Sequence, residues 1–266
     1  LAVNKWKIGK LVQTGEEGDR SFEELRFDQI ADAIYHFVRD TFCGWYLELI
    51  KGQLDIETRA VAGWSLDQIL VMLHPLMPFI TEELWHAMGQ RQYDLIIARW
   101  PDSAYQADAA AVAQVSWATG LIGEIRSVRN ELGIGHSIEL RARVIEESQF
   151  AKTARLEQSS SIHRLAKFSA LEQPGHGDLE RGLQIAVGGG HYFIPLEGVI
   201  DIDAEKARLA KALEASTKEA KSLEARLANP AFVERAKPEA VDKARADHAH
   251  HAAEVARLEA ALARLG

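Results

Sequence analysis

Apolar residues recur at helical spacing along the first part of the chain. Between Phe27 and Leu49 they return every three or four residues, which marks one buried face of a helix. Just before this stretch, Ser21 and Glu24 have the spacing of a capping box, in which the two side chains satisfy free N–H groups of the first turn. The pattern therefore predicts a helix that begins near Ser21 and ends at about Gly52.

The same spacing predicts further helices. One covers roughly residues 57–74 and stops at Pro75, because proline lacks the N–H and its ring collides with the preceding turn. A short one over 81–88 uses its first residue, a threonine, as the cap, and a long one runs from about 105 to 132. Antiparallel helices with short links predict a helical bundle over residues 1–134.

The pattern changes after the bundle. Apolar and charged residues alternate over 138–144, and residues 184–187 and 191–196 have the composition of two more strands. Three glycines at 188–190 separate these two strands. Because a strand follows the glycines rather than a helix, they predict a hairpin turn and not a phosphate-binding loop. Residues 135–200 are therefore expected to form a small α/β domain.

The clearest periodicity lies near the C-terminal end. Two apolar series with steps of four and three residues run from Ile202 to Leu227 and from Val241 to Leu265, with prolines between them. Folding the second series back on the first keeps a constant register, which predicts an antiparallel two-helix coiled coil over 201–266. About 25 residues per helix give this arm a reach of roughly 35–40 Å. The whole chain is thus predicted to be mainly α, with a bundle, a small α/β junction and a coiled-coil arm.

Composition excludes several classes of protein. With 47% apolar and 26% charged residues, the chain is typical of a soluble globular protein and not of a disordered one. The longest apolar run, Ile69 to Ile80, is short and interrupted by prolines, so no segment is expected to span a membrane. Cys43 is the only cysteine, so no internal disulfide can form, and we expect a cytoplasmic protein.

Charge is distributed unevenly along the chain. The net charge of −8 disfavours a nucleic-acid binder when it is considered alone. Residues 202–266, however, hold 12 Lys and Arg against 11 Asp and Glu, whereas residues 1–201 hold 19 against 28. The acidity therefore lies outside the arm, and local basic faces are compatible with the total.

No complete catalytic or metal site is evident in the sequence. His248 and His251 fall on the seam of the arm, and no cysteine or carboxylate set completes a tetrahedral zinc site. Glu82 and Glu83 are adjacent on a helix and point in different directions, so they are not expected to form an acid–base pair. We interpret them as acidic residues of the kind favoured at a helix N-terminus. We therefore predict no catalytic residue, no metal and no cofactor in this chain.

Several phrases of the sequence resemble one enzyme family. Residues 42–51 (FCGWYLELIK) resemble a stretch of the anticodon-binding bundle of valyl-tRNA synthetases, with Gly44 in place of the usual aspartate. Residues 74–85 (HPLMPFITEELW) resemble a signature shared by valyl-, isoleucyl- and leucyl-tRNA synthetases. Residues 125–131 and 194–201, the latter leading into the arm, resemble the valyl type, and the arm itself singles out that family.

This resemblance implies the C-terminal part of a class Ia synthetase that attaches valine to its tRNA with ATP. The bundle would recognise the anticodon of valine tRNA, the α/β segment would join bundle and arm, and the arm would lie against the outer corner of the tRNA. ATP, the catalytic site and the editing domain would belong to the preceding part, so this chain alone would bind tRNA without aminoacylating it. The parent enzyme would be a cytoplasmic monomer, and this chain would bind neither a membrane nor a metal.

Within the bundle, recognition of unstacked anticodon bases calls for aromatic faces and arginine planes. The matched stretch supplies Phe42 and Trp45, with Arg26 and Lys51 at its two ends. Aromatic residues at helical spacing are also common in protein cores, and this alternative stays open. Phe42 is the preferred base platform, because Trp45 continues the apolar stripe and Phe42 lies beside it.

Phosphate contacts are expected from two further sets of cations. Arg126 and Arg129 share a helix face and could bind phosphates or pair with neighbouring glutamates. On the arm, basic residues form a strip along the first helix and add charge near the tip and on the returning helix. Such a strip fits contact with the tRNA backbone rather than with bases, and the alternative is ordinary solubilising charge. The arm residues are Arg208, Lys211, Lys218, Lys221, Arg226, Arg235, Lys243 and Arg245.

Two other functions remain compatible with the sequence. The bundle and arm could form a protein-interaction scaffold, because mixed-charge heptads suit protein partners as well as RNA. The chain could also be the equivalent region of another class Ia synthetase, since the signature over 74–85 does not choose among the three. Salt-dependent binding of valine tRNA separates the scaffold from the tRNA-binding hypothesis.

Overall fold

The computed structural model describes residues 1–101, 106–171, 182–235 and 237–265, without the side chains of residues 171, 231, 234, 235 and 264. The described chain forms two compact units. The first comprises Leu1–Gly120 with Thr153–Ser161, and the second comprises Leu121–Lys152 with Ile162–Gly266.

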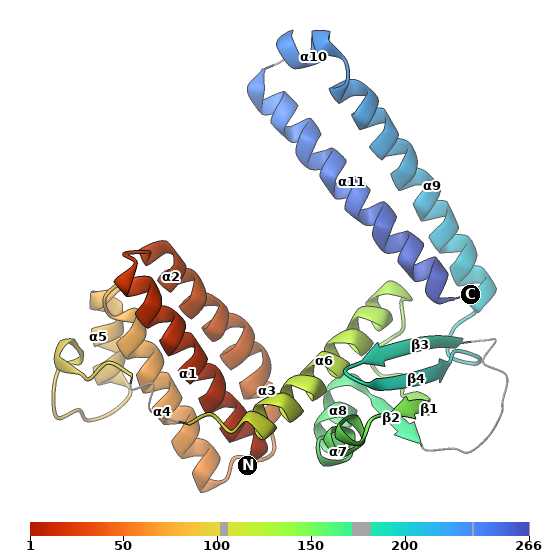
Figure 1. Ribbon diagram of the computed structural model, residues 1–266. Coiled ribbons are helices and arrows are strands. Elements are labelled where there is room, and N and C mark those ends of the chain that lie inside the picture. The colour runs from red at the N-terminus through yellow and green to blue at the C-terminus, as the bar shows by residue number, and fades with distance from the viewer. Residues whose placement is uncertain (102–105, 172–181, 236, 266) are drawn as a thin grey trace. The chain divides into compact units, whose positions relative to one another are not determined.

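The first unit is a helical bundle (Figure 1). α1 packs against α2, η1 and α4, and α4 packs in turn against α5. In chain order its elements are α1 (Ala2–Glu23), α2 (Phe27–His36), η1 (Phe37–Tyr46), α3 (Leu47–Ile50), α4 (Ile56–Leu73), α5 (Pro78–Ala87), η2 (Leu95–Ile97) and the first half of α6 (Ala109–Glu131).

The first helix already begins at Ala2, so the prediction of a helix that starts near Ser21 is wrong. Ser21 lies in the last turn of α1, where its hydroxyl donates to the carbonyl of Glu17 at 2.8 Å and caps nothing. The chain then turns at Leu25, whose φ of 58° is left-handed, and α2 follows. The spacing of Ser21 and Glu24 is therefore an ordinary pair of positions at a helix C-terminus, where the capping-box pattern has no N–H groups to satisfy.

The middle of the predicted long helix is wound as a π-helix, η1. Such a helix closes its hydrogen bonds over five residues instead of four, is rare, and often occurs at functional sites. The wider turn rotates the apolar stripe relative to the spacing of an α-helix. Phe42 and Tyr46 consequently face the core, whereas Trp45 is only half-buried.

Prolines position the next two helices. α4 ends two residues before Pro75, as predicted. α5, however, begins at Pro78, because the fixed φ of proline suits the first turn and no N–H is needed there. Thr81 therefore lies inside the helix, where its hydroxyl donates to the carbonyl of Met77 at 2.8 Å, and the prediction that it caps the helix is wrong. Glu82 likewise lies beyond the first turn and is not an N-terminal acid.

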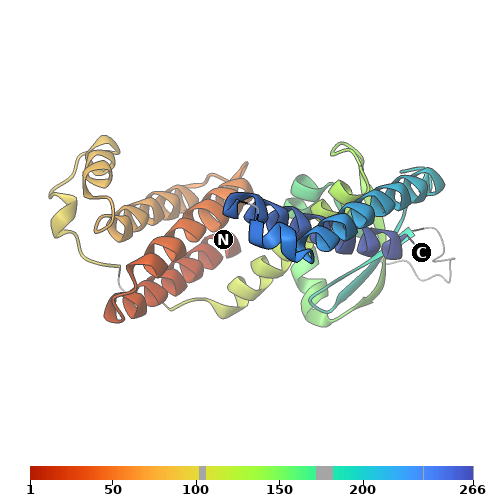
Figure 2. The same ribbon diagram turned by 90° about the horizontal axis from the view of Figure 1, so that it is seen from above.

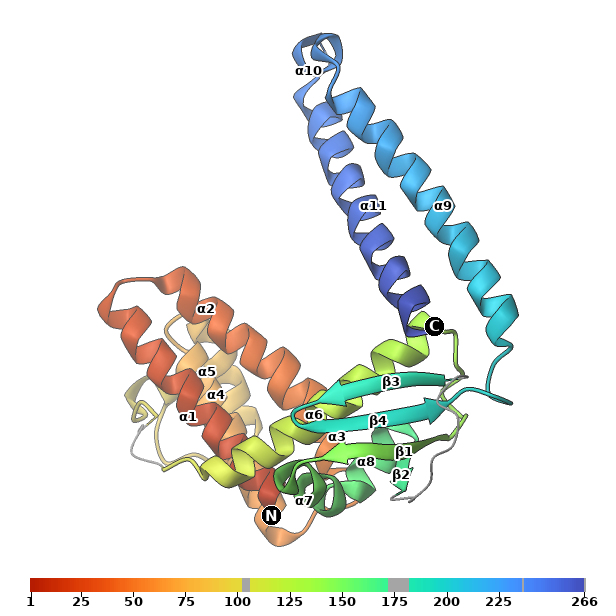
Figure 3. The ribbon, with the colours of Figure 1, turned by 45° about the vertical axis from the view of Figure 1, so that its right-hand side comes forward.

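The second unit contains a four-stranded sheet with the order β2-β1-β4-β3 (Figure 3). β1 is parallel to β2 and antiparallel to β4, and β3 and β4 form an antiparallel hairpin. The hairpin turns at Gly188 and Gly189, both with positive φ, which confirms the turn predicted there. The elements of this part are the second half of α6, β1 (Leu140–Glu147), β2 (Phe168–Leu171), β3 (Gly182–Val187) and β4 (Gly190–Pro195), and α7 (Gln149–Glu157) and α8 (Ser159–Ala166) contribute to both units.

The C-terminal part of the second unit is an antiparallel helical hairpin, as predicted. α9 (Ile202–Leu227) and α11 (Pro238–Arg264) lie side by side, joined through the short α10 (Pro230–Arg235) (Figures 1 and 2). Every predicted seam position of the two series is buried or half-buried. Asp201 caps α9, because its carboxylate accepts the N–H of Ala204 at 3.0 Å.

These elements confirm the predicted fold class, a mainly α protein with a bundle, a small sheet and a helical arm. The helices of the described residues include none with the length and apolar character needed to cross a bilayer.

Candidate nucleic-acid interface

Aromatic side chains of η1 surround a buried lysine of α1. The Nζ atom of Lys7 lies 3.7 Å from the ring centre of Phe37, 4.8 Å from that of Phe42 and 5.9 Å from that of Tyr46. Lys7 is fully buried, and its ammonium has no hydrogen-bond partner among the described residues. Burial lowers the pKa of Lys7 to about 7. Phe42 is only 7% exposed and packs on this lysine, so the core alternative fits it better than the predicted role as a base platform.

The other predicted residues of this region are more accessible. Trp45 is half-buried, so it has more open surface than the phenylalanine three residues before it. Arg26 and Lys51 are exposed, and each lies beside an acid: the Nε atom of Arg26 is 3.5 Å from Asp28, and Lys51 pairs with Glu48. Ion pairs at exposed positions are weak, so both cations can exchange their partner for a phosphate.

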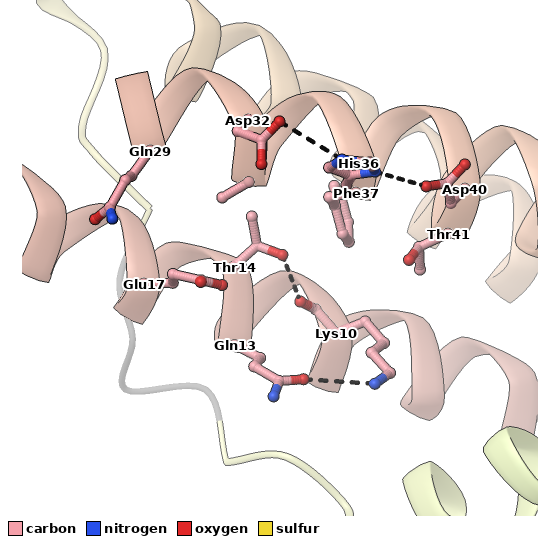
Figure 4. Close-up of a pocket in the computed structure, with 11 residues that line it drawn as sticks. Lys10, Gln13, Thr14, Glu17, Gln29, Asp32, His36, Phe37, Asp40 and Thr41 are labelled. Atoms are coloured by element: carbon pink, nitrogen blue, oxygen red, sulfur yellow. Dashed lines mark hydrogen bonds and ion pairs between the residues drawn. The ribbon is translucent and has the colours of Figure 1, made fainter. Parts of the chain in front are cut away.

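A polar groove of about 610 Å³ lies between α1 on one side and α2 with η1 on the other (Figure 4). We call it the α1–α2 groove. The sequence does not predict this groove, because the apolar pattern does not show which polar positions of two helices face each other. The polar side chains that line it are Lys10, Gln13, Thr14 and Glu17 from α1, and Gln29, Asp32, His36, Asp40 and Thr41 from α2 and η1.

A histidine that lies between two carboxylates forms part of one wall of this groove. The Nδ1 atom of His36 lies 2.8 Å from Asp40, and its Nε2 atom lies 3.5 Å from Asp32. The hydrogen bond with Asp40 is the main reason that the pKa of His36 is raised above its ordinary value. The spacing of Asp32, His36 and Asp40, four residues apart each time, is the sequence signal that could have indicated this wall.

The two arginines at the end of α6 both donate to backbone carbonyls. Arg129 is 2% exposed, and burial lowers the pKa of its guanidinium. Arg126 is half-buried and donates to the carbonyl of Leu165 at 3.2 Å. Arg129 is thus a buried donor to the backbone and fits neither the predicted phosphate contact nor the predicted pairing with neighbouring glutamates. A phosphate contact by Arg126 stays a prediction. Arg129 donates at 2.5–3.1 Å to the backbone carbonyls of Gly135, Ile138, Ala166 and Lys167.

The cations of α9 lie in solvent. Lys211, Lys218 and Lys221 are exposed, and among the described residues none of them has an ion-pair partner. Arg208 is also exposed but donates to both carboxylate oxygens of Glu205, at 2.8 and 2.5 Å. Its Nη2 atom in addition lies 3.3 Å from the carbonyl of Glu131, so this arginine is fastened at the base of the arm.

The tip and the returning helix of the arm carry the remaining predicted cations. The guanidinium of Arg226 lies 4.2 Å from the ring centre of Phe232, a cation–π contact that closes the tip. The side chain of Arg235 lies outside the described residues. Lys243 and Arg245 on α11 are exposed, and Arg245 lies 3.6 Å from its neighbour Asp242.

Two groups of metal-ligating residue types are packed into the structure. Over the described residues, Glu82, His86 and Asp94 bring three ligand atoms within 4.8 Å of one another. The Nε2 atom of His86 lies 3.0 Å from Glu82 and 3.2 Å from Asp94, and Glu82 also accepts the N–H of Leu95. These bonds fasten the loop after α5 to that helix. The seam histidines of the arm, at 248 and 251, are half-buried.

Family models match both ends of the chain. Residues 4–145 match the model of the anticodon-binding domain of tRNA ligase, which covers more than half of the chain. Residues 201–266 match the model of the valyl tRNA synthetase tRNA binding arm. The first match runs from the first turn of α1 into β1, and the second coincides with the helical hairpin.

Curated relatives extend over the whole chain. A valine–tRNA ligase of Rhizorhabdus wittichii is 49% identical over 275 residues, which cover 100% of this chain and 30% of the relative. Valine–tRNA ligases of Sphingopyxis alaskensis and Zymomonas mobilis are 45% and 42% identical, and the chain covers 32% and 31% of their length. The chain thus spans about a third of these relatives.

Proposed function

The chain belongs to the family of anticodon-binding domains of tRNA ligases, and on this premise we propose that it is the part of a valine–tRNA ligase that binds valine tRNA. The observation that carries the proposal is the joint presence of two tRNA-binding modules in one chain, the anticodon-binding domain and the arm. The names of the relatives supply the amino acid, valine.

The two modules divide the work according to their surfaces. The bundle, with its groove and the half-buried Trp45, takes the anticodon loop, because recognition of unstacked bases needs hydrogen-bonding edges and flat faces. The arm contacts the phosphate backbone, because its exposed cations Lys211, Lys218 and Lys221 provide charge without base-specific groups. Backbone contacts fix the position of a nucleic acid, and base contacts supply the specificity.

The parent protein in this proposal is a cytoplasmic monomer that joins valine to its tRNA with ATP. ATP, the catalytic residues and the editing site belong to the remaining two-thirds of the length seen in the relatives. The chain by itself then needs no metal or cofactor and does not aminoacylate tRNA. Incubation with valine, ATP and valine tRNA should produce no valyl-tRNA, and measurable charging would show that this assignment of the catalytic site is wrong.

Titration of the full chain with valine tRNA tests the main proposal. We expect binding that is tighter than to a tRNA with an unrelated anticodon, and that weakens linearly on a log–log plot as salt rises from about 50 to about 200 mM, because neutralised phosphates release counterions. Absent binding, or binding that does not respond to salt, would instead favour the protein-interaction scaffold.

A further inference from the structure

We propose that the α1–α2 groove recognises the exocyclic amino group of an unstacked adenine or cytosine in the anticodon loop. This inference rests on the proposed function and deepens it, since it names the base class and the side chains that select it. The groove has about 610 Å³ of space, within the roughly 300–1,000 Å³ of pockets that hold small organic ligands.

The charges of the groove favour a base over a phosphate. Three carboxylates line it, Glu17, Asp32 and Asp40, against two groups that carry positive charge, Lys10 and His36. His36 is already engaged between Asp32 and Asp40, and the ammonium of Lys10 lies 3.5 Å from the side-chain oxygen of Gln13. A surface with this excess of acceptors repels a phosphate, whereas it suits the N–H donors on the edge of a base.

The accessible acceptors stand across from one another. Gln29 and Asp32 extend from α2 toward α1, and Glu17 lies opposite them on α1 (Figure 4). All three side chains are exposed, so a base can reach them without a rearrangement of the core. Carboxylates accept from the N4 amino group of cytosine, and a glutamine amide can pair with adenine at N6 and N7. The carbonyl oxygens of uracil or guanine at the same positions would meet a carboxylate without a proton between them.

The wide turn of η1 is a second feature of this site. Phe37, Asp40 and Thr41 belong to the π-helix and line the groove, while Phe42 and Tyr46 of the same helix pack on Lys7. A π-helix is costly and rare, and it often marks a functional site. Here it presents polar groups to the groove and aromatic groups to the core within ten residues.

The base class agrees with the proposed tRNA. Valine codons begin with guanine and uracil, so the anticodon of valine tRNA carries cytosine and adenine at the matching positions. Both of these bases bear an exocyclic amino group, and each loses it in a single-group exchange. Cytosine becomes uracil, and adenine becomes hypoxanthine, when the amino group is replaced by a carbonyl oxygen.

These exchanges give the test. The full chain is titrated with anticodon stem-loops of valine tRNA that carry cytosine or uracil, and adenine or hypoxanthine, at the two positions. We expect at least one exchange to weaken binding about 10-fold or more, which is the usual size of discrimination by a good base contact.

Protein variants then locate the contact. Glu17→Ala and Asp32→Ala should reduce the preference for cytosine to within about 2-fold, in line with the loss of one such contact. Gln29→Ala should do the same to the preference for adenine. Glu16→Ala is the matched control, because Glu16 is the neighbouring exposed acid on α1 and does not line the groove. Glu17→Ala, Asp32→Ala and Glu16→Ala each remove one negative charge and so raise RNA affinity in general, which is why the preference and not the affinity is compared. Circular dichroism of each variant checks that these exposed substitutions leave the helices folded.

Three results are decisive against the inference. A preference that survives Glu17→Ala, Gln29→Ala and Asp32→Ala would place the recognition elsewhere. A preference that falls equally in Glu16→Ala would reduce the effect to general charge. If the unmodified chain binds valine tRNA in a salt-dependent manner but does not distinguish the amino bases, the groove inference fails while the proposed function stands. Absent tRNA binding, by contrast, means that the proposed function itself fails.

Discussion

The cations of the bundle and the sheet region differ from those of the arm in their burial. Lys7 in the bundle and Arg129 beside the sheet are buried, the first over aromatic rings and the second under backbone carbonyls. Lys211, Lys218 and Lys221 on α9 lie in solvent. The difference follows from the architecture, because a bundle or a sheet encloses side chains on several sides, whereas a two-helix hairpin encloses only one seam.

This contrast separates two consequences of positive charge. A buried cation stabilises or destabilises the folded protein, depending on whether partners inside the protein offset the cost of its desolvation. An exposed cation on a regular surface contributes little to folding but can neutralise a phosphate. We therefore expect substitutions at buried cations to change stability and to leave RNA affinity unchanged. Substitutions on the arm should change RNA affinity and leave stability unchanged.

The largest expected effect is at Arg129. Arg129→Met removes the N–H groups that donate to four backbone carbonyls. The carbonyls of Gly135 and Lys167 keep one backbone donor each, the N–H groups of Ile138 and Leu140. The carbonyls of Ile138 and Ala166 lose the donor that Arg129 supplies, at a cost of about 1–3 kcal/mol each, so we expect a loss of stability on the order of 4 kcal/mol. Urea unfolding measures the loss, and Arg126→Met, which removes a donor to Leu165, should cost less. Normal stability combined with weakened tRNA binding would mean that Arg129 acts as a phosphate contact after all.

A change of opposite sign is expected at Lys7. Lys7→Met replaces a buried ammonium that lacks a hydrogen-bond partner among the described residues by an apolar chain of similar length, so the variant should be more stable. The pKa of Lys7 is about 7 in the folded protein and 10.5 in the unfolded chain. Below about pH 7 the lysine is charged in both states and the cost of burying its charge is fully present. As the pH rises from about 7 to about 10.5, the folded form loses its proton first and this cost disappears.

The pH dependence gives this prediction its test. Unfolding at about pH 6 should show Lys7→Met to be more stable by roughly 3 kcal/mol, since the cation–π contacts offset part of the desolvation. The advantage should shrink steadily toward about pH 10, because the wild-type chain gains stability over that range. A difference that stays constant with pH would show that Lys7 does not titrate in the folded protein.

A smaller and purely electrostatic effect is expected on the arm. Reversing three charges with Lys211→Glu, Lys218→Glu and Lys221→Glu should leave the hairpin folded, since all three side chains are exposed. If each lysine neutralises one phosphate, the slope of log affinity against log salt becomes less steep by up to about 3. The loss should be equal for valine tRNA and for a tRNA with an altered anticodon. A loss confined to one anticodon would assign base recognition to the arm.

Where the sequence predicted structure well, one periodicity accounted for a whole element. The arm has a single seam, so two heptad series sufficed to place α9 against α11 and to assign their buried positions. The glycines before β4 likewise predicted the hairpin, because a strand follows them. Both features depend on residues that are close in sequence or related by one repeat.

The bundle was harder to predict because its features depend on contacts between helices. The spacing of Ser21 and Glu24 matched a cap, but α1 occupies that position. The prediction from Phe27 onward used the spacing of an α-helix, in which Trp45 continues the apolar face and Phe42 lies beside it. In the π-helix, Phe42 is buried instead and Trp45 is only half-buried. The α1–α2 groove could not be derived from either helix alone. Burial of Lys7 and Arg129 also depends on distant parts of the chain, so a charge pattern could not distinguish them from the arm cations.

The smallest expected effect is a difference in phosphate binding between two cations of the arm. Arg208 and Lys218 both belong to the predicted strip, but Arg208 donates to Glu205 and to the carbonyl of Glu131, whereas Lys218 has no ion-pair partner among the described residues. To bind a phosphate, Arg208 must first give up these partners, and the released Glu205 would then repel the RNA. Lys218→Ala should therefore lower the salt slope of tRNA binding by about 0.9, and Arg208→Ala by clearly less. The reverse order in a pair of salt titrations would mean that Arg208 leaves Glu205 when tRNA binds, so that the base of the arm, rather than its middle, holds the backbone.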